Sequence, residues 1–146
     1  MKIALIPQIA TLGMAVAFLP AVAAQSKAAP GLDYEFFKTR VQPLFLAKRP
    51  GHARCYVCHS TATTFRLERL SPGATTWDDE QSRRNFEAAR RLVVPGDWQA
   101  SRLLTHPLAP DAGGDPFHSG GKHWDSRSNP EWQVLADWVN GQKASR

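Results

Sequence analysis

Cysteine and methionine are scarce in this 146-residue chain, which contains two of each. Both methionines, Met1 and Met14, stand near its beginning. A single pair of cysteines excludes a zinc site built from two matched cysteine pairs, and a disulfide between residues only three positions apart would stabilise little. There is no internal repeat, low-complexity tract or block of basic residues. The remaining composition, 42% hydrophobic and 21% charged, is typical of one globular domain.

The segment 1–24 has the order of parts found in secretory signal peptides. Lys2 precedes an apolar run, and Pro20 and small alanines follow before the polar Gln25. This pattern predicts that the segment is removed on export to the periplasm, which leaves a domain of residues 25–146. Retention of the segment as a membrane anchor is the alternative, and membrane association is expected only in that case.

The net charge of the predicted mature domain is small. It contains 17 Lys and Arg against 13 Asp and Glu, because only Lys2 of the 18 basic residues lies in the predicted signal peptide. A surplus of this size, spread along the chain, does not indicate nucleic-acid binding. It suits at most docking to an acidic protein face or to an anionic membrane surface.

The two cysteines belong to the segment RCYVCH, residues 54–59, which is a CxxCH motif. Two thiols at this spacing lie one helical turn apart, where they can add to the two vinyl groups of one porphyrin, and the adjacent imidazole can then ligate the iron. The flanking residues read as helix and loop, unlike the strand-containing unit of a thioredoxin-like redox pair. The motif therefore predicts one covalent haem c, attached through Cys55 and Cys58 and ligated by His59.

The ligand on the other face of the iron is open to several interpretations. Methionine, the usual choice in small electron carriers, is absent from the predicted mature domain. His118 is the leading candidate, because glycine pairs on both sides of it let the backbone approach a porphyrin closely. His106, His123, a ligand other than histidine and an open site are the alternatives. His52 lies seven residues before His59, so it is expected to stay on the same side of the haem as His59 and not to serve as the second ligand.

Hydrophobic spacing and capping residues predict an all-α fold without a sheet. A long loop rich in Gly, Asp, Ser and Pro is expected over 107–128, and an extended stretch over 61–70. The expected helices cover 33–48, capped by Asp33 and bent near Pro43; 76–93, with a capping box of Thr76 and Asp79; 98–105, capped by Asp97; and 130–140, capped by Asn129 and ended by Gly141.

The order of these features over residues 33–142 resembles the bacterial c-type cytochrome domain family. The resemblance implies a cytochrome c-like all-α fold, in which the N- and C-terminal helices cross and pack around one covalent haem. Many members carry a Met-Pro pair where this chain has His118. Besides CxxCH, the matching residues are Phe37, Val41, Pro43, Leu44, Phe45, Val93, Pro95, Gly96, Ser101, Leu103, Trp138 and Val139.

Together these features predict a periplasmic electron carrier and not an enzyme, with redox proteins as partners and no nucleic acid. Ligation by His59 and His118 predicts a reduction potential below that of His/Met cytochromes. Two alternatives are kept. One is a haem-based gas sensor with a weakly held or open distal position, and the other is a small peroxidase-like enzyme in which Arg102 or His106 supplies acid–base chemistry.

Overall fold

The computed structural model describes residues 30–61 and 63–145. These residues form helices and loops but no β-strand, and three isolated bridges are the only pairings of the β type among them. The predicted all-α class is confirmed at this level. The predicted signal peptide lies outside the described residues. Within them, no helix is long and apolar enough to cross a membrane.

The N-terminal helical segment is built from three consecutive pieces. In chain order these are α1 (Tyr34–Phe36), a π-helical turn η1 (Phe37–Val41) and α2 (Gln42–Leu46). The predicted cap is confirmed, because the Asp33 carboxylate accepts a hydrogen bond from the backbone N of Phe36 at 2.7 Å. The predicted interruption near Pro43 is the π-helical turn. It widens the helix just before a residue that has no N–H to donate.

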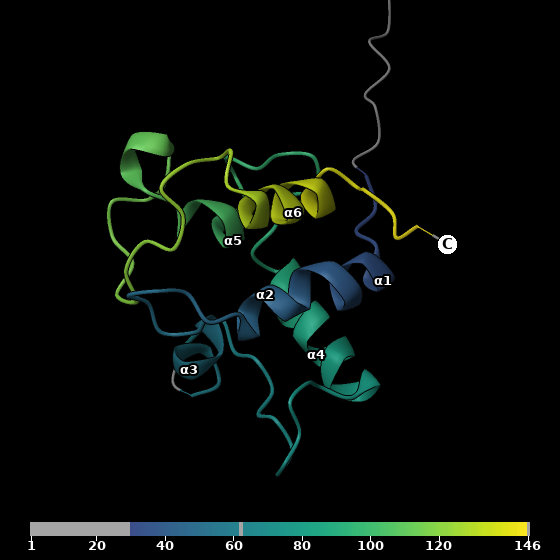
Figure 1. Cartoon of the computed structure of the whole chain (residues 1–146). Helices are drawn as coiled ribbons and strands as arrows, with labels where there is room; N and C mark the ends of the chain where they lie inside the picture. Colours follow the sequence, from purple (N-terminus) through teal and green to yellow (C-terminus); the bar gives the residue numbers. More distant parts are fainter. Residues whose placement is uncertain (1–29, 62, 146) are drawn as a thin grey trace, which may run out of the picture.

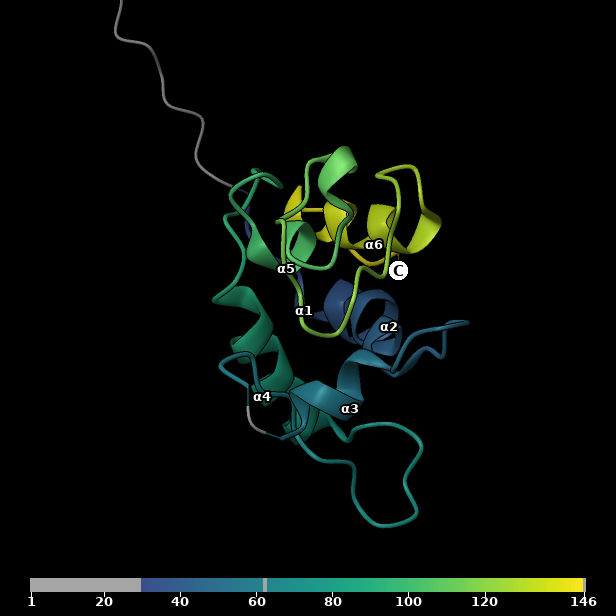
Figure 2. The same ribbon diagram turned by 90° about the vertical axis from the view of Figure 1, so that its left-hand side faces the viewer.

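The CxxCH motif itself forms a short helix, α3 (Cys55–His59). A segment of bends without regular secondary structure follows it over 63–70, and the backbone N of Leu67 in this segment donates to the carbonyl of His59 at 2.7 Å. Figures 1 and 2 show that α3 lies on one side of α2, opposite the C-terminal helix.

The next helix is α4 (Asp79–Arg90). Its N-cap is Asp78, two residues after the predicted cap Thr76. The capping box consists of Asp78, whose carboxylate accepts from the backbone N of Gln81 at 2.8 Å, while the Gln81 side chain accepts from the backbone N of Asp78 at 3.2 Å. The prediction of Thr76 and Asp79 is therefore wrong. Asp78 has the extended conformation of an N-cap, which places its short carboxylate within reach of the first helical turn.

The buried face of α4 is more polar than the helical spacing of its apolar residues predicts. Ser82 and Asn85 are both fully buried beside Ala89. Gln42 of α2 satisfies both, because its amide donates to the Ser82 hydroxyl at 2.9 Å and accepts from the Asn85 amide at 3.4 Å. This buried polar chain fixes α4 against the N-terminal helical segment.

The predicted helix over 98–105 is shorter in the structure. It is α5 (Arg102–Thr105), because the Asp97 carboxylate bonds the backbone N atoms of Gln99 and Ala100 at 2.9 and 3.1 Å and holds those residues in a turn. The predicted long loop follows, interrupted only by a 3-10 turn, η2 (Pro110–Ala112).

The C-terminal helix, α6 (Pro130–Val139), has the predicted cap and end. The Asn129 side chain accepts from the backbone N of Glu131 at 2.9 Å, and Gly141, with φ of 84°, follows the helix. Figure 1 shows α6 lying across the N-terminal helical segment. The contact is made by Trp138, whose ring centroid lies 5.2 Å from that of Phe37 and whose indole N–H donates to the backbone carbonyl of Asp33 at 2.9 Å.

Candidate cofactor-binding site

A cavity of about 330 Å³ opens between α3, α5 and the long loop. All the residues that the sequence analysis predicted as cofactor ligands or attachment sites line this cavity. They are Cys55, Cys58, His59, His106, His118 and His123. The remaining wall is mostly apolar and includes Phe45, Phe65, Leu92, Leu103, Trp124 and Leu135. The fold thus brings the motif and the loop histidines into one mostly apolar cavity.

His59 is held by the residues that follow the motif. Its Nδ1 lies 2.9 Å from the carbonyl oxygen of Phe65 and 3.0 Å from the hydroxyl of Thr63. Because a carbonyl oxygen can only accept, the imidazole carries its proton on Nδ1 and donates it there. In the neutral ring this tautomer leaves the Nε2 lone pair available to a metal, which is the usual arrangement of a ligating histidine.

His118 has the same arrangement on the long loop. Its Nδ1 lies 2.5 Å from the carbonyl oxygen of Gly121, whose φ of 79° requires glycine. Burial lowers the pKa of His118, and the neighbouring His106 and His59 lower it further. The imidazole is therefore neutral near pH 7 and has Nε2 available for coordination.

The imidazole rings of His59 and His118 lie near each other in the cavity with almost parallel planes. Their ring centroids are 6.3 Å apart and their planes are 12° from parallel. A histidine nitrogen binds a metal at about 2.0 Å, and the ring centre lies about 1 Å behind that nitrogen, so two histidines on opposite sides of one ion have centroids about 6 Å apart. The observed separation agrees with one metal ion between the two rings if both Nε2 atoms are directed at it.

His106 lines the same cavity but has a different environment. Its Nδ1 lies 2.8 Å from the Asp115 carboxylate and 3.3 Å from the Arg102 guanidinium, and its ring packs edge-on against His118 at 4.8 Å. Lys122 fixes this corner of the loop by donating to the backbone carbonyls of His106, at 2.9 Å, and of Asp115. Arg102 and His106, the two residues expected to serve an enzyme, therefore lie together.

His123 presents a buried nitrogen without a partner. Its Nδ1 is the one buried side-chain polar atom that makes no hydrogen bond within the described residues. Burial, with help from the nearby Arg49, lowers the pKa of His123 to about 4, so the ring is neutral near pH 7. An unsatisfied buried polar atom costs about 1–3 kcal/mol, and a polar group bound in the cavity beside His123 could remove that cost.

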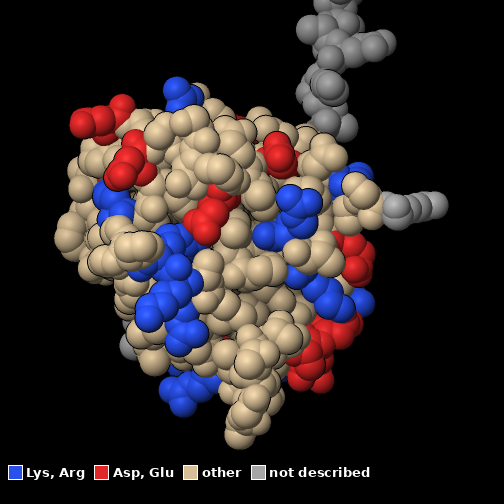
Figure 3. Space-filling model, in the orientation of Figure 1, with Lys and Arg blue, Asp and Glu red and all other residues tan. Residues whose placement is uncertain are grey.

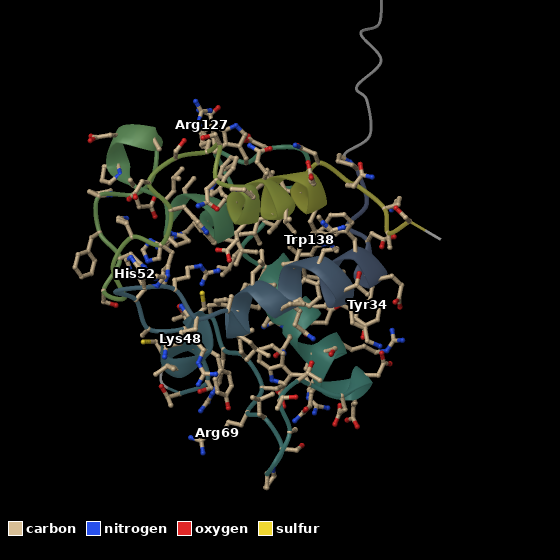
Figure 4. All side chains as sticks on the ribbon, in the orientation of Figure 1. Tyr34, Lys48, His52, Arg69, Arg127 and Trp138 are labelled. Atoms are coloured by element: carbon tan, nitrogen blue, oxygen red, sulfur yellow. The ribbon has the colours of Figure 1, made fainter. Side chains whose placement is uncertain are left out.

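His52 does not stay with the motif as expected. Its ring centroid lies 5.0 Å from that of His123, and its Nδ1 lies close to Gly121. The turn at Gly51, with φ of 73°, folds the chain back so that His52 packs against the long loop instead. Figure 4 labels His52 at this edge of the molecule.

Sequence reasoning missed a partly buried ion pair beside the cavity. The Arg49 Nε lies 2.5 Å from a carboxylate oxygen of Glu131, and the same oxygen accepts from the Trp124 indole at 3.1 Å. Arg49 also lies 5.5 Å from the Trp124 ring centroid and 3.9 Å from the Cys55 sulfur. The sequence does not indicate that Arg49 and Glu131 pair, because the two residues are far apart in the chain and do not share a helix. Together they tie the motif to α6.

The two motif cysteines carry free thiols, with Cys55 partly buried and Cys58 exposed. Burial raises the pKa of the Cys55 thiol, and the neighbouring Arg49 acts against this rise. Among residues 30–61 and 63–145, no three His, Cys, Asp or Glu side chains converge as a site for a bare metal ion. Two imidazoles alone suit a metal whose remaining ligands come from a cofactor.

No family model, curated protein or solved structure matches the chain. The function of the cavity is therefore inferred from the chemistry and geometry of its own residues.

Proposed function

We propose that the protein is an exported c-type cytochrome that transfers electrons in the periplasm and carries one haem. The haem is attached through Cys55 and Cys58 and ligated by His59 and His118. The observation that carries this proposal is the nearly parallel pair of imidazoles, with ring centroids 6.3 Å apart, in the cavity that both cysteines line. The packing of α6 across the N-terminal helical segment supports a cytochrome c-like fold.

The residues of the cavity fit this group by their chemistry. The two thiols can form thioether bonds, the two Nε2 atoms can serve as axial ligands, and the unpartnered Nδ1 of His123 can donate to a polar substituent. Bound haem would supply a one-electron couple between Fe(III) and Fe(II). The apolar wall excludes water and so favours retention of a large aromatic macrocycle.

Both imidazoles are held in place before any ligand binds. The carbonyls of Phe65 and Gly121 fix the orientation of His59 and His118 respectively, so neither ring has to turn when it coordinates. If His59 and His118 both held the metal, the protein would leave no position on it for a substrate or a gas. This favours an electron carrier over a sensor or an enzyme.

A peroxidase-like enzyme is the second candidate, and the cluster of Arg102, His106 and Asp115 favours it. The Asp115 carboxylate accepts from Nδ1 of His106 at 2.8 Å and leaves Nε2 of that ring free for proton transfer. This function requires His118 to leave the metal. Peroxide turnover by the purified protein that is lost in a His106→Gln variant would select the enzyme over the carrier.

Covalent attachment can be tested by expressing the full chain with a bacterial c-type haem maturation system and weighing the denatured product. We expect the mass of one haem on the wild type and none on a Cys55→Ser, Cys58→Ser double variant. A wild-type chain that matures without haem, while a known c-type cytochrome expressed beside it is loaded, would contradict the proposal.

A further inference from the structure

A second groove, separate from the cofactor cavity, lies along another face of α6. Its volume is about 670 Å³, and it shares no lining residue with the cofactor cavity. We call it the α6 groove. Aromatic, charged and amide side chains line it together, among them Trp98, Trp132, Asp111, Asp125, Arg127 and Gln133. Such a mixture is typical of a site for a ligand that is partly polar.

Trp98 forms an aromatic wall of the α6 groove and is held in place by its neighbours. Its ring packs edge-on against the buried Trp132, with centroids 5.6 Å apart and planes at 77°. The far end of the ring lies against Gly113, where an added side-chain carbon would be 3.4 Å from Cη2 of Trp98. The indole is therefore a fixed surface on which a ligand can pack.

The indole N–H of Trp98 has no partner within the described residues. Trp77, Trp124, Trp132 and Trp138 each donate theirs to a carbonyl or carboxylate oxygen, at 2.7, 3.1, 3.3 and 2.9 Å respectively. Trp98 is partly buried as well, and a buried indole N–H usually finds an acceptor. The groove therefore leaves one aromatic donor free for a ligand.

The charged groups of the α6 groove are free too. The carboxylates of Asp111 and Asp125 are exposed, and neither makes a hydrogen bond or an ion pair in the described part of the chain. The Arg127 guanidinium makes neither as well, and its Cζ lies 4.8 Å from the Trp98 ring centroid. Figure 3 shows acidic side chains near an isolated basic one at the top of the molecule, where Figure 4 labels Arg127.

The loop that carries Asp125 and Arg127 is fixed against α6. The Gln133 amide donates to the backbone carbonyl of Arg127 at 2.5 Å, and the hydroxyls of Ser126 and Ser128 lie 2.8 Å apart. The side chain of Arg127 is held only by its contact with Trp98, and an exposed cation–π contact is weak. The backbone of the groove is thus preorganised, whereas the guanidinium can move off the indole.

A ligand with several hydroxyls matches these groups better than an ion does. A carboxylate only accepts hydrogen bonds and a guanidinium or indole N–H only donates them, whereas a hydroxyl does both. A cation would leave the indole N–H and Arg127 without partners, and the two carboxylates disfavour an anion. A neutral sugar ring has hydroxyls around its rim and an apolar face of C–H groups that can pack on an aromatic ring.

We propose that the α6 groove binds a neutral saccharide. A sugar ring packs on Trp98 after the Arg127 side chain has moved aside. Its hydroxyls accept from the indole N–H and from the guanidinium, and they donate to the carboxylates of Asp111 and Asp125. Because the groove shares no residue with the cofactor cavity, this proposal goes beyond the proposed function and does not depend on it.

Saccharide binding can be tested with three neutral oligosaccharides, namely cellohexaose, maltohexaose and N-acetylchitotriose. Each is titrated by calorimetry into the protein as purified from cells, up to about 5 mM, a range that covers weak ligands. NMR spectra of the isotope-labelled, reduced protein then follow the indole N–H signal of Trp98, which a Trp98→Phe variant identifies by its absence. We expect at least one of the three to bind and to shift this signal.

Two double variants with the same change of charge test the contribution of the carboxylates. Asp111→Ala with Asp125→Ala removes two exposed carboxylates that have no partner in the described residues, and we expect binding at least about tenfold weaker than in the wild type. Glu35→Ala with Asp137→Ala removes two exposed carboxylates outside the groove and is expected to stay within about twofold of the wild type.

Several outcomes overturn the proposal. None of the three oligosaccharides binds, or one binds without moving the Trp98 signal, or the two double variants bind it equally well. Spermidine serves as the probe of a cationic ligand. Spermidine that binds and shifts the Trp98 signal, while none of the oligosaccharides does, would assign the α6 groove to a cation instead.

Discussion

The ring centroids of His59 and His118 lie 6.3 Å apart with planes 12° from parallel, although the two residues are 59 positions apart in the chain. One ring is oriented by the carbonyl of Phe65 and the other by the carbonyl of Gly121. Two independent backbone contacts therefore hold Nδ1 of two imidazoles that line one cavity.

Gly121→Ala is expected to loosen His118. The φ of 79° at Gly121 is strained for alanine by about 1 kcal/mol or more, and relief of that strain moves the carbonyl that holds the imidazole. Optical spectra of the haem-loaded variant should show a partial shift from low spin to high spin. Gly73→Ala is the control, because Gly73 has a similar φ of 77° with nothing near its side-chain position. The control should lose stability without a change of spectrum, and equal spectra in the two variants would count against a role for Gly121.

Glu131→Gln is expected to destabilise the fold. The substitution leaves the Arg49 guanidinium, whose side chain is only 10% exposed, without its carboxylate, and we expect a loss of about 1–3 kcal/mol in the free energy of unfolding. Denaturant titration followed by tryptophan fluorescence measures this loss. Glu87→Gln is the matched control, since Glu87 pairs with Arg90 on an exposed surface and should change stability by less than about 0.5 kcal/mol.

Asp79→Asn is expected to flatten the acid dependence of stability. Hydrogen bonds from Lys38 and Tyr34, together with Arg83, lower the pKa of Asp79 from 3.8 to about 2. A pKa that is lower in the folded than in the unfolded state stabilises the fold above about pH 4, and this contribution is lost as the pH falls to about 2. Free energies of unfolding measured across that range should fall less steeply in the variant.

Asp125→Asn is the control for this pH dependence. Asp125 is exposed and makes no hydrogen bond or ion pair in the described residues, so the variant should follow the wild-type curve. A wild-type slope in Asp79→Asn would show that the contacts of Asp79 with Lys38 and Tyr34 do not persist in solution.

His106→Gln is expected to leave the axial ligands unchanged. His106 packs edge-on against His118 and is bound through Nδ1 to Asp115, so its loss removes a neighbour of the site but no proposed ligand. The oxidised and reduced spectra should remain low-spin. A high-spin spectrum in this variant would transfer the distal position from His118 to His106.

Local signals in the sequence predicted several of the helix ends correctly. The caps Asp33 and Asn129 and the end of α6 before Gly141 were predictable, because each depends on a side chain or a φ value within a few residues. The choice of Thr76 over Asp78 as a cap was wrong. Both can accept hydrogen bonds, and only the backbone conformation before α4 decides between them.

Contacts between distant segments were beyond sequence reasoning. The pair of Arg49 and Glu131 is formed across the fold, and nothing near either residue indicates its partner. The placement of His52 against the long loop depends on a turn at Gly51 whose direction the sequence does not specify. The grouping of the cavity histidines was predicted only as a list of candidates, which the structure places in one cavity.

The most direct test of the central claim is the optical spectrum of the haem-loaded protein beside that of a His118→Ala variant, each oxidised and reduced. His52→Ala is the control, because His52 lies beside the loop but does not line the cavity. We predict a low-spin six-coordinate wild type, an unchanged control, and a high-spin His118→Ala variant that binds carbon monoxide rapidly when reduced. A His118→Ala variant that keeps the low-spin spectrum of the wild type would contradict ligation by His118.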